Sequence, residues 1–426
     1  MTILQPIATQ GCGCDQRDTV KSLISIDAAL TLIREHTTTV RELEEIPLGL
    51  ALGRILASPV CARSATPPFD NAAMDGYAVT TAALTGAGPW ELAVVARVPA
   101  GRVAPPALSG MSAARIFTGA PVPAGADAVV MQEDVQRTGE SIRIKRRPLP
   151  GQNIRRAGTE MAAGTMVLGQ GRCLGPREIA ACAAAGAGTV RVQRRLRVAL
   201  LVTGDEVRPA GTDRAEAQIW DVNTPMLSAA LTRPSVDLVA VECGADCPEA
   251  LLSQLARLAG AADLLITTGG ISVGEEDHVK PALQALGVEL AFSGVAIKPG
   301  KPVSFGRIGG AAWLGLPGNP LSAFITWQLF GSALIHGLTG EQHDTALRRH
   351  VVTAQDISRK TGRCEVRPAI FTGFDPKGRE VVTFDAETHS ARASGLVAAS
   401  GLIFLPADTA FLPAGALVEY LPFCPT

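Results

Sequence analysis

The chain has 426 residues, which is too long for one ordinary hydrophobic core and indicates about two to four domains. Hydrophobic residues make up 47% of it, which excludes a disordered protein or an acidic tail. The 39 Lys and Arg residues nearly balance the 40 Asp and Glu residues, and this balance argues against a nucleic-acid binder, which needs a basic surface to neutralise phosphates.

The cysteines and the apolar runs bear on the compartment. Nine cysteines are scattered along the chain without a paired CxxC pattern, and this favours reduced, structural thiols over a zinc site. We find no signal sequence. The longest apolar run, residues 321–335, contains Thr326, Gln328 and Gly331 and is expected to be too short to span a bilayer. The sequence therefore predicts a soluble, cytoplasmic protein with no membrane partner.

The N-terminal part of the chain predicts a tail and a mixed domain. Residues 1–20 are expected to form a flexible tail, and Ser25 is a suitable N-cap for a helix that begins near Asp27. A second helix is predicted from Pro176 to about Ala185, because proline suits the first helical position. We assign two separate segments to one mixed linker domain, residues 21–65 and 151–195.

Residues 66–150 differ in texture and predict a small β domain, in which β-rich runs alternate with Gly/Pro turns. The predicted strands are residues 91–98, 128–132 and 141–145. Two rigid, proline-containing segments also lie here, at 67–78 and 116–127, and the first carries Asp70 and Asp75. Composition alone leaves open whether these segments are functional or are turns that pack between domains.

From Arg197 onward, apolar strands alternate with helices. The predicted strands are residues 198–202, 238–241, 263–267 and 312–316. The predicted helices lie near 225–231, from Pro248, from about Asp277 to Leu286, and from Leu321. This alternation predicts a doubly wound α/β domain over residues 196–340, a class in which ligands bind outside the carboxyl ends of the strands. Residues 341–426 return to a β pattern and predict a C-terminal β domain.

Four polar or glycine-rich segments follow these strands directly, and we expect them to converge on one crevice. They are residues 203–206, 244–246, 267–274 and 317–320. The third resembles a phosphate cradle, because its glycines let backbone amides approach an anion and its hydroxyl groups add donors. The cradle residues are Thr268, Gly269, Gly270, Ser272 and Gly274. The alternative is a tight turn that needs glycine only for steric reasons, and the three similar loops favour the cradle.

Carboxylates are the second feature of these strand ends, where Asp205, Glu206, Asp246 and Asp277 are found. Singly, each could be only a helix cap or a partner of a helix dipole. Several carboxylates beside a bound phosphate would repel the ligand, however. A hard cation resolves this conflict, since Mg²⁺ binds one or two carboxylates together with substrate phosphates. The sequence therefore predicts a magnesium site.

Lys298 and Lys301 supply the opposite charge. Two prolines and a glycine hold them in a stiff loop that suits an oxyanion, and a solvated basic turn is the alternative. The loop is not a Walker motif, because Pro302 stands where that motif requires Ser or Thr. No HExxH, GxSxG or GxGxxG motif occurs, so zinc peptidases, serine hydrolases and Rossmann dehydrogenases lack support.

Seven motifs follow one another along the chain. They are Pro-Phe-Asp-Asn-x-Ala-Met-Asp-Gly-Tyr-Ala at 68–78, Thr-Gly-Ala-Pro at 118–121, Asn-Ile-Arg-Arg-x-Gly at 153–158, Thr-Gly-Asp-Glu at 203–206, Thr-Gly-Gly-Ile-Ser-Val-Gly at 268–274, Lys-Pro-Gly-Lys-Pro at 298–302 and Leu-Pro-Gly-Asn-Pro-x-Ser at 316–322. From about residue 24 to the C-terminus, the chain resembles the molybdopterin molybdenumtransferase (molybdenum insertase) family, which is related to the C-terminal domain of gephyrin.

The resemblance implies a multidomain α/β plus β protein. Its central doubly wound α/β domain would be of the molybdopterin-binding type, accompanied by a helical linker domain that serves dimerisation, a small β domain and a C-terminal β-barrel-like domain. The implied reaction converts adenylated molybdopterin and molybdate into molybdenum cofactor and AMP with the help of Mg²⁺. The resemblance also implies an elongated homodimer whose active site lies between two chains, and it suggests the adenylyltransferase of the pathway as a partner.

Matching positions carry the roles of the family over to this chain. The residues expected to be catalytic are Asp75, Glu206, Asp246 and Asp277, and the last three would also bind the metal. Lys298 and Lys301 would handle the anionic substrate, and Arg363 and Ser390 are candidates for the molybdate site. All residues expected to bind substrate are Thr118, Thr203, Gly204, Asp205, Thr268, Gly269, Gly270, Ser272, Gly274, Lys298, Lys301, Pro317, Gly318, Asn319, Ser322, Arg363 and Ser390.

Some positions depart from the family pattern, and other functions stay open. Gly294 stands where relatives often carry Lys or Arg, Glu160 replaces a usual Asp, and residues 389–400 match loosely. One rival function is adenylyl transfer to molybdopterin, which would consume ATP and release pyrophosphate. Another is a non-enzymatic scaffold with a peptide-binding groove, which would not need Asp75 or Glu206.

Overall fold

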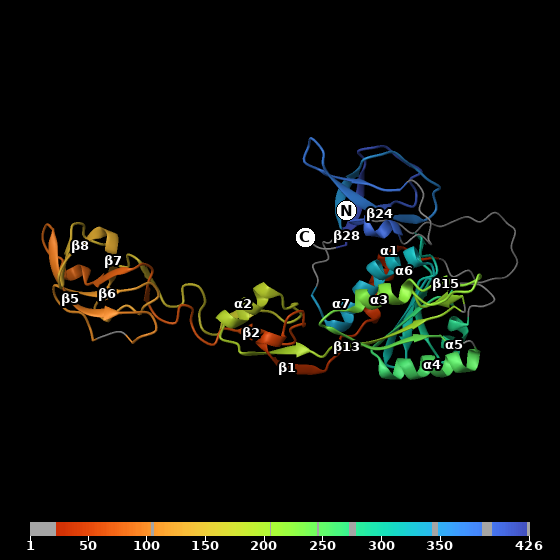
Figure 1. The fold of residues 1–426 in the computed structure, drawn as a ribbon, viewed down its shortest axis with the longest axis horizontal. Coiled ribbons are helices and arrows are strands. Elements are labelled where there is room, and N and C mark those ends of the chain that lie inside the picture. The colour runs from red at the N-terminus through yellow and green to blue at the C-terminus, as the bar shows by residue number, and fades with distance from the viewer. Residues whose placement is uncertain are drawn as a thin grey trace. The chain divides into compact units, whose positions relative to one another are not determined.

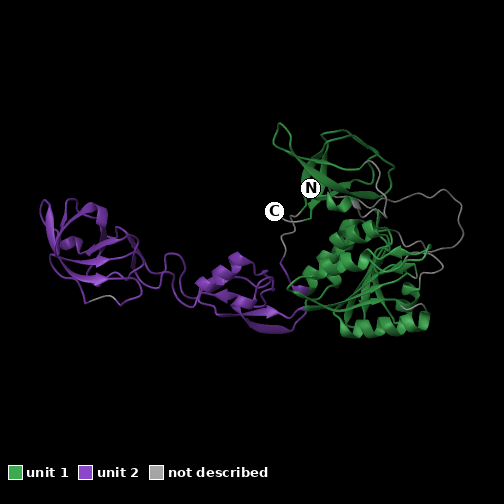
Figure 2. Cartoon of the chain, in the orientation of Figure 1, with its two compact units in different colours: residues 1–39, 196–338, 343–426 green, residues 40–195, 339–342 purple. Residues whose placement is uncertain are grey.

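The computed structural model describes most of the chain and divides it into two compact units. The described residues are 23–103, 106–204, 206–244, 247–271, 278–342, 348–385 and 394–423. Unit 1 comprises Met1–Thr39, Leu196–Leu338 and His343–Thr426, and unit 2 comprises Val40–Arg195 and Thr339–Gln342 (Figure 2). The predicted tail, residues 1–20, lies outside the described residues.

Unit 2 contains a six-stranded sheet in the order β7-β4-β6-β5-β9-β8. Its elements are β4 (Gly76–Val79), a 3-10 turn (Thr81–Ala83), β5 (Trp90–Val98), β6 (Ser112–Ile116), β7 (Ala128–Met131), a 3-10 turn (Gln132–Asp134), β8 (Val135–Thr138) and β9 (Ser141–Ile144). The three predicted strands are confirmed as β5, β7 and β9. Composition did not reveal β4, which begins with a glycine because a Cβ on Gly76 would lie 2.0 Å from Val130 O.

The rest of unit 2 surrounds helix α2 (Pro176–Ala184). Pro176 opens this helix, and Glu178 Oε2 accepts a hydrogen bond from Gly175 N at 3.2 Å, so the predicted helix is confirmed. The remaining elements are β1 (Leu43–Pro47) paired with β12 (Thr189–Gln193), a 3-10 turn (Leu48–Leu50), β2 (Val60–Cys61) paired with β11 (Met166–Leu168), and β3 (Asn71–Ala72) paired with β10 (Ile154–Arg155). Each pair joins segments that precede and follow the six-stranded sheet in sequence.

Unit 1 contains a second six-stranded sheet, in the order β16-β13-β17-β21-β20-β18. Its strands are β13 (Leu196–Val202), β16 (Val236–Cys243), β17 (Leu264–Thr268), β18 (Glu289–Ser293), β20 (Ser304–Ile308) and β21 (Ala311–Leu316). The first four in this order are parallel, as predicted, whereas β20 and β18 add an antiparallel edge that strand–helix alternation did not reveal. The strand order reverses between β13 and β17, and ligands bind at the carboxyl ends beside such a reversal.

Helices cover both faces of this sheet (Figure 1). They are α1 (Ile26–His36), α3 (Asn223–Leu231), α4 (Pro248–Ala261), α5 (Val279–Ala285) and α6 (Pro320–Thr326). On the face of α4 and α5, Leu255, Leu283 and Trp313 belong to one buried cluster. The other face carries α1, α3 and α6 (Figure 1). Ser25 Oγ accepts a hydrogen bond from Ala28 N at 3.1 Å and caps α1, which confirms the predicted cap.

The helix after β21 is longer than the apolar run suggested. It continues from α6 through a π-helical turn (Trp327–Gly331) into α7 (Ser332–Thr339). The whole stretch, Pro320–Thr339, has 20 residues and is long and apolar enough to cross a membrane, so the prediction that it is too short to span a bilayer is wrong. Two thirds of its most apolar part (67%) is buried inside the protein, which is typical of a core helix.

The C-terminal residues of unit 1 form a closed ring of strands. The ring consists of β22 (Arg349–Thr353), β24 (Cys364–Phe374), β25 (Glu380–Thr383), β26 (Gly401–Leu405) and β28 (Leu417–Pro422), in the order β24-β25-β22-β28-β26 with β26 paired back to β24. It encloses a buried cluster that includes Val351, Ile403 and Tyr420. The predicted barrel-like C-terminal β domain is therefore confirmed. The remaining short elements are β14 (Val207–Arg208), β15 (Ile219–Trp220), β23 (Ile357–Ser358), a 3-10 turn (Ser394–Val397) and β27 (Phe411–Leu412).

One short strand joins the α/β part of unit 1 to this ring. β19 (Ile297–Lys298) pairs in parallel with the start of β24, so that Lys298 lies opposite Glu365. Cys364 N also donates a hydrogen bond to Ala296 O at 3.0 Å. The predicted cationic loop therefore starts as a strand of the C-terminal sheet.

Candidate functional site

The described parts of all four strand-end segments lie side by side. Thr203 N donates a hydrogen bond to Thr268 O at 3.0 Å, and Gly269 N donates to Leu316 O at 3.2 Å. A Cβ on Gly244 would lie 2.5 Å from Thr203 Cγ2, so the segment after β16 also touches the segment after β13. The expected convergence of these segments is therefore observed for the described residues, and a common ligand crevice stays a prediction.

The glycines after β17 have a steric role. Gly269 and Gly270 have φ angles of 87° and 61°, which favour glycine over residues with a side chain. A Cβ would lie 2.5 Å from Thr203 O at Gly269 and 2.6 Å from Val279 Cγ2 at Gly270. The turn therefore needs both glycines without any ligand, and its role as a phosphate cradle stays a prediction. Its other predicted members, Ser272 and Gly274, lie outside the described residues.

A buried amide links two of these segments, and the sequence motifs gave no sign of it. Asn223, the first residue of α3, donates from Nδ2 to Thr268 Oγ1 at 2.9 Å and to Gly318 O at 2.7 Å. Thr268 Oγ1 in turn donates to Pro317 O at 3.0 Å. A polar residue at the start of a helix that follows the first strand was the only available signal.

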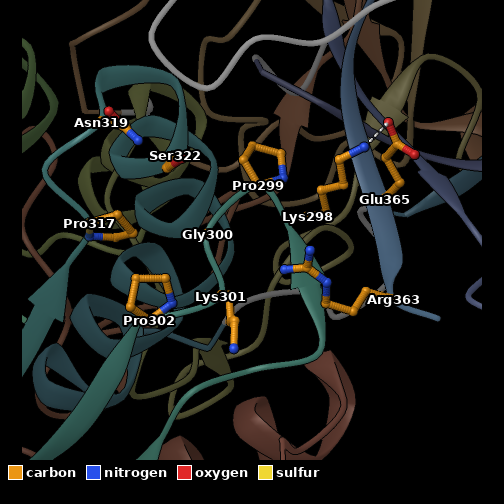
Figure 3. Close-up of a pocket in the computed structure, with 10 residues that line it drawn as sticks. All are labelled: Lys298, Pro299, Gly300, Lys301, Pro302, Pro317, Asn319, Ser322, Arg363 and Glu365. Atoms are coloured by element: carbon orange, nitrogen blue, oxygen red, sulfur yellow. Dashed lines mark ion pairs between the residues drawn. The ribbon is translucent and has the colours of Figure 1, made fainter. Parts of the chain in front are cut away.

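The cationic loop and the loop after β21 line one cavity of about 350 Å³. Its lining residues are Lys298, Pro299, Gly300, Lys301, Pro302, Pro317, Asn319, Ser322, Arg363 and Glu365. In Figure 3, Pro317, Asn319, Ser322 and Pro302 lie on one side and Lys298, Arg363 and Glu365 on the other, with Pro299, Gly300 and Lys301 between them. The cavity thus brings together Lys298, Lys301 and Arg363, which we expected to contact an anion, with Pro317, Asn319 and Ser322 of the expected substrate loop.

The negative charge of Glu365 in this cavity is neutralised by two arginines that do not line the cavity. Glu365 is 2% exposed, and Arg359 Nε lies 3.2 Å from its Oε2, while Arg367 Nη2 lies 2.9 Å from its Oε1. Lys298 Nζ lies 3.7 Å from the same Oε1. Two guanidinium groups against one carboxylate leave this wall positive. With Lys298, Lys301 and Arg363 at its surface, the cavity suits a small anion.

Arg363 is held in place by the same wall. Its Nη1 donates to Ile297 O at 3.3 Å, and its own carbonyl oxygen accepts a hydrogen bond from Arg359 Nη2 at 2.6 Å. The adjacent Cys364 is half-buried, and desolvation raises the pKa of its thiol to about 11. This thiol therefore stays protonated at neutral pH, in accord with a structural role for the cysteine.

The predicted metal ligands are only partly described. Glu206 lies directly before β14, and its side chain is exposed. Asp205, Asp246, Asp277 and the molybdate-site candidate Ser390 lie outside the described residues. Within the described ranges, no group of three or more His, Cys, Asp or Glu side chains could hold a metal ion. The predicted donors are all carboxylates, the ligand type that Mg²⁺ prefers, but the fit of the whole set stays a prediction.

Asp75 and Thr118 form a second site feature, within unit 2. Thr118 N and Thr118 Oγ1 each donate to Asp75 Oδ1 at 2.8 Å. The backbone hydrogen bond from Thr118, followed by that of its hydroxyl group, holds the pKa of Asp75 below its usual value. Asp75 Oδ2 has no hydrogen-bond partner among the residues described, so the ionised carboxylate keeps one oxygen for a ligand.

Arg115 supports the turn that carries Asp75, although no sequence motif pointed to this residue. Its guanidinium group lies over the rings of Tyr77 at 5.0 Å and Phe117 at 4.9 Å, and its Nη1 donates to Gly76 O at 3.2 Å. Arg115 therefore contacts both segments that carry the Asp75–Thr118 pair.

The structure explains one of the two single-residue departures from the family pattern, Gly294, and does not explain the other, Glu160. Gly294 has a φ angle of 98°, and a Cβ there would lie 2.8 Å from Leu23 Cδ2, so a lysine or arginine would be strained in this backbone. Glu160 N donates to Thr66 O at 3.0 Å, but nothing in the structure explains the choice of Glu over Asp.

Family comparisons cover most of the chain. Residues 24–186 match the model described as the MoeA N-terminal region (domain I and II). Residues 199–336 match a probable molybdopterin binding domain, and residues 350–423 match the MoeA C-terminal region (domain IV).

Individual relatives agree with the family models. Molybdopterin molybdenumtransferase 2 of Mycobacterium tuberculosis is 34% identical over 91% of this chain and 98% of its own length. Molybdopterin molybdenumtransferase of Haemophilus influenzae is 32% identical over 94% of this chain and 99% of its own length. The crystal structure of the molybdopterin biosynthesis MoeA protein from Pyrococcus horikoshii matches with a TM-score of 0.80 and 27% identity, over 94% of this chain and all of that one (100%).

Proposed function

Because this chain belongs to the MoeA family, we propose that it is a molybdopterin molybdenumtransferase of molybdenum cofactor biosynthesis. In the proposed reaction it inserts molybdate into adenylated molybdopterin and releases AMP. The cavity of Lys298, Lys301 and Arg363 is the observation that carries this proposal, since it can capture molybdate as an anion.

The charge of the cavity lining supports the binding of an oxyanion. Molybdate carries two negative charges, which the cationic side chains offset, and Ser322 adds a hydroxyl group at the opposite side (Figure 3). The two prolines of the loop limit its motion, so less conformational entropy is lost when the anion binds. These residues would hold the anion while the two dithiolene sulfurs replace oxygen ligands of the molybdenum, which would take up protons and leave as water.

The adenylated pterin would bind at the neighbouring strand ends. Thr203 and Gly204, the turn from Thr268 to Gly270, and the loop from Pro317 to Ser322 supply hydroxyl and amide donors for its phosphate. Mg²⁺, bound by Glu206, Asp246 and Asp277, would supply positive charge to the phosphate that is cleaved. We assign no general base, and the released AMP leaves from this side of the sheet.

Asp75 and Thr118 would enter the active site from a second chain. In the proposed homodimer, the β domain of one protomer completes the α/β site of its partner, which would explain why an ionised carboxylate so remote in sequence is needed. Domain limits at 21–65 with 151–195, 66–150, 196–340 and 341–426, a cytoplasmic location, and contact with the adenylyltransferase of the pathway belong to the same proposal.

An AMP-release assay tests the proposed function. Adenylated molybdopterin and Mg²⁺ are incubated with the protein, and AMP is measured with and without molybdate. We expect molybdate-dependent release by the wild type, a large loss in Glu206→Ala and Asp75→Ala, and no loss in Lys377→Ala, whose side chain is exposed on the turn between β24 and β25. Release of pyrophosphate from ATP instead would support adenylyl transfer, and no AMP from the wild type would exclude the proposed reaction.

A further inference from the structure

The hydrogen-bond network around Asn223 determines which amide atom faces the two loops. The single hydroxyl proton of Thr268 goes to Pro317 O, so Thr268 Oγ1 must accept from Asn223. Gly318 O is also an acceptor. Both contacts require Nδ2, because Oδ1 in that place would face two acceptors.

The other amide atom, Asn223 Oδ1, is buried and has no hydrogen-bond partner among the described residues. Asn223 as a whole is 6% exposed. An unpartnered acceptor in such a place is costly, so a residue that only filled space would be apolar. What asparagine provides, and an apolar side chain cannot, is a pair of directed hydrogen bonds to two different loops.

These loops have different tasks in the proposed function. Thr268 opens the turn that faces the phosphate, whereas Gly318 belongs to the loop that lines the cationic cavity through Pro317, Asn319 and Ser322. Asn223 itself does not line that cavity. Any effect of Asn223 on a bound anion must therefore pass through its loop contacts.

We propose that Asn223 is a positioning residue that holds the cavity-lining loop Pro317–Ser322 in register with the turn Thr268–Gly270. Through this link, the oxyanion in the cavity and the phosphate of the adenylated substrate are presented to each other in a fixed arrangement. The link itself stands on the hydrogen bonds, whereas the identity of the two ligands rests on the proposed function.

Hydrogen–deuterium exchange tests the link without a ligand. In Asn223→Ala, we expect amides in segments 268–271 and 316–324 to exchange about tenfold faster, the effect of losing a net hydrogen bond, while β16 is unchanged. Ser228→Ala, on the same helix, is the matched control and should exchange like the wild type. Equal exchange in wild type and Asn223→Ala would overturn the proposal. If the alanine variant does not fold, Asn223→Asp, which keeps the shape but places a carboxylate oxygen against the carbonyl oxygen of Gly318, should give the same faster exchange in segment 316–324.

Molybdate titration by calorimetry tests the consequence for the cavity. We expect Asn223→Ala and Thr268→Val each to weaken molybdate binding about tenfold. The double variant should bind molybdate about as well as the weaker of the two single variants, because both substitutions break the same link between Asn223 and Thr268. Fully additive losses, or wild-type affinity in Asn223→Ala, would overturn the proposal and leave the proposed function intact. If the wild type binds no molybdate but the exchange difference is present, the proposed function fails and the link stands.

Discussion

Lys298 Nζ lies 3.7 Å from Glu365 Oε1, and the two residues are direct neighbours in the register of β19 and β24. The lysine comes from the motif loop of the α/β part, and the glutamate comes from the C-terminal barrel. Because Glu365 also contacts the buried Arg359 and Arg367, this one pair connects the cationic loop to a fixed positive wall. Both parts of unit 1 therefore shape the cavity.

Removing Lys301 tests the cationic loop. We expect Lys301→Ala to weaken molybdate binding about 10- to 100-fold, because a charge-assisted contact is lost, and to make the remaining affinity less sensitive to salt. Titration calorimetry at two ionic strengths measures both effects. Lys377→Ala serves as the control for a general loss of positive charge. Wild-type affinity in Lys301→Ala would contradict a role for the loop in anion binding.

Removing the charge of Glu365 tests the buried wall. Glu365→Gln leaves Arg359 and Arg367 buried without their carboxylate, and we expect a loss of about 3–5 kcal/mol in the free energy of unfolding. Urea denaturation measures it. The control is Glu419→Gln, whose side chain is 39% exposed and lies 3.5 Å from Arg348, so its loss should cost no more than about 1 kcal/mol. A similarly small effect for Glu365→Gln would show that the wall does not depend on this carboxylate.

The Thr118 hydrogen bonds set the ionisation of Asp75. These bonds lower the pKa of Asp75 in the folded protein below its unfolded value, so the carboxylate stays ionised below the unfolded pKa and is protonated only as the pH falls through the folded pKa. In Thr118→Val the side-chain bond is gone, and we expect the pKa of Asp75 to rise and the acid limb of AMP release to move to higher pH. Carboxyl-carbon NMR titration and the pH profile measure the two shifts. Thr138→Val, exposed on β8, should shift neither; an unmoved Asp75 pKa in Thr118→Val would refute the assignment.

Alanine substitutions at Gly269 and Gly211 separate the cost of backbone strain from the cost of a steric conflict. Both have left-handed φ angles, 87° and 86°, but a Cβ would lie 2.5 Å from Thr203 O at Gly269 and meets nothing within 4 Å at Gly211. We expect Gly211→Ala to cost about 1–2 kcal/mol and Gly269→Ala to cost about 1–3 kcal/mol more. Urea denaturation of both variants gives the difference. Equal costs would mean that the turn after β17 can move away from Thr203.

Much of the fold could be predicted because its signals are local. The apolar run before Thr203 is buried on both faces of a parallel sheet, and Ser25 and Pro176 mark helix starts by their own chemistry. β4 was not predicted, because Gly76, which lets it approach β7, also interrupts the residue pattern typical of a strand. The antiparallel edge of β18 and β20 depends on long-range pairing that periodicity does not encode.

The candidate site could be predicted only where its residues stand in motifs. Lys298, Lys301 and the loop after β21 were found in this way, and their meeting in one cavity follows from the topology of the sheet. Asn223 and Arg115 were missed because each acts through contacts between distant segments, which leave no spacing pattern in the sequence. Arg363 was a loose match, and only the register of β19 on β24 places it beside the lysines.

Anomalous diffraction at the molybdenum absorption edge, from crystals grown with molybdate, tests most directly whether this cavity receives the metal oxyanion. Our account predicts a molybdenum peak among Lys298, Lys301 and Arg363 in the wild type and its loss in Lys301→Ala. An empty cavity in wild-type crystals, with molybdenum bound elsewhere or not at all, would contradict it.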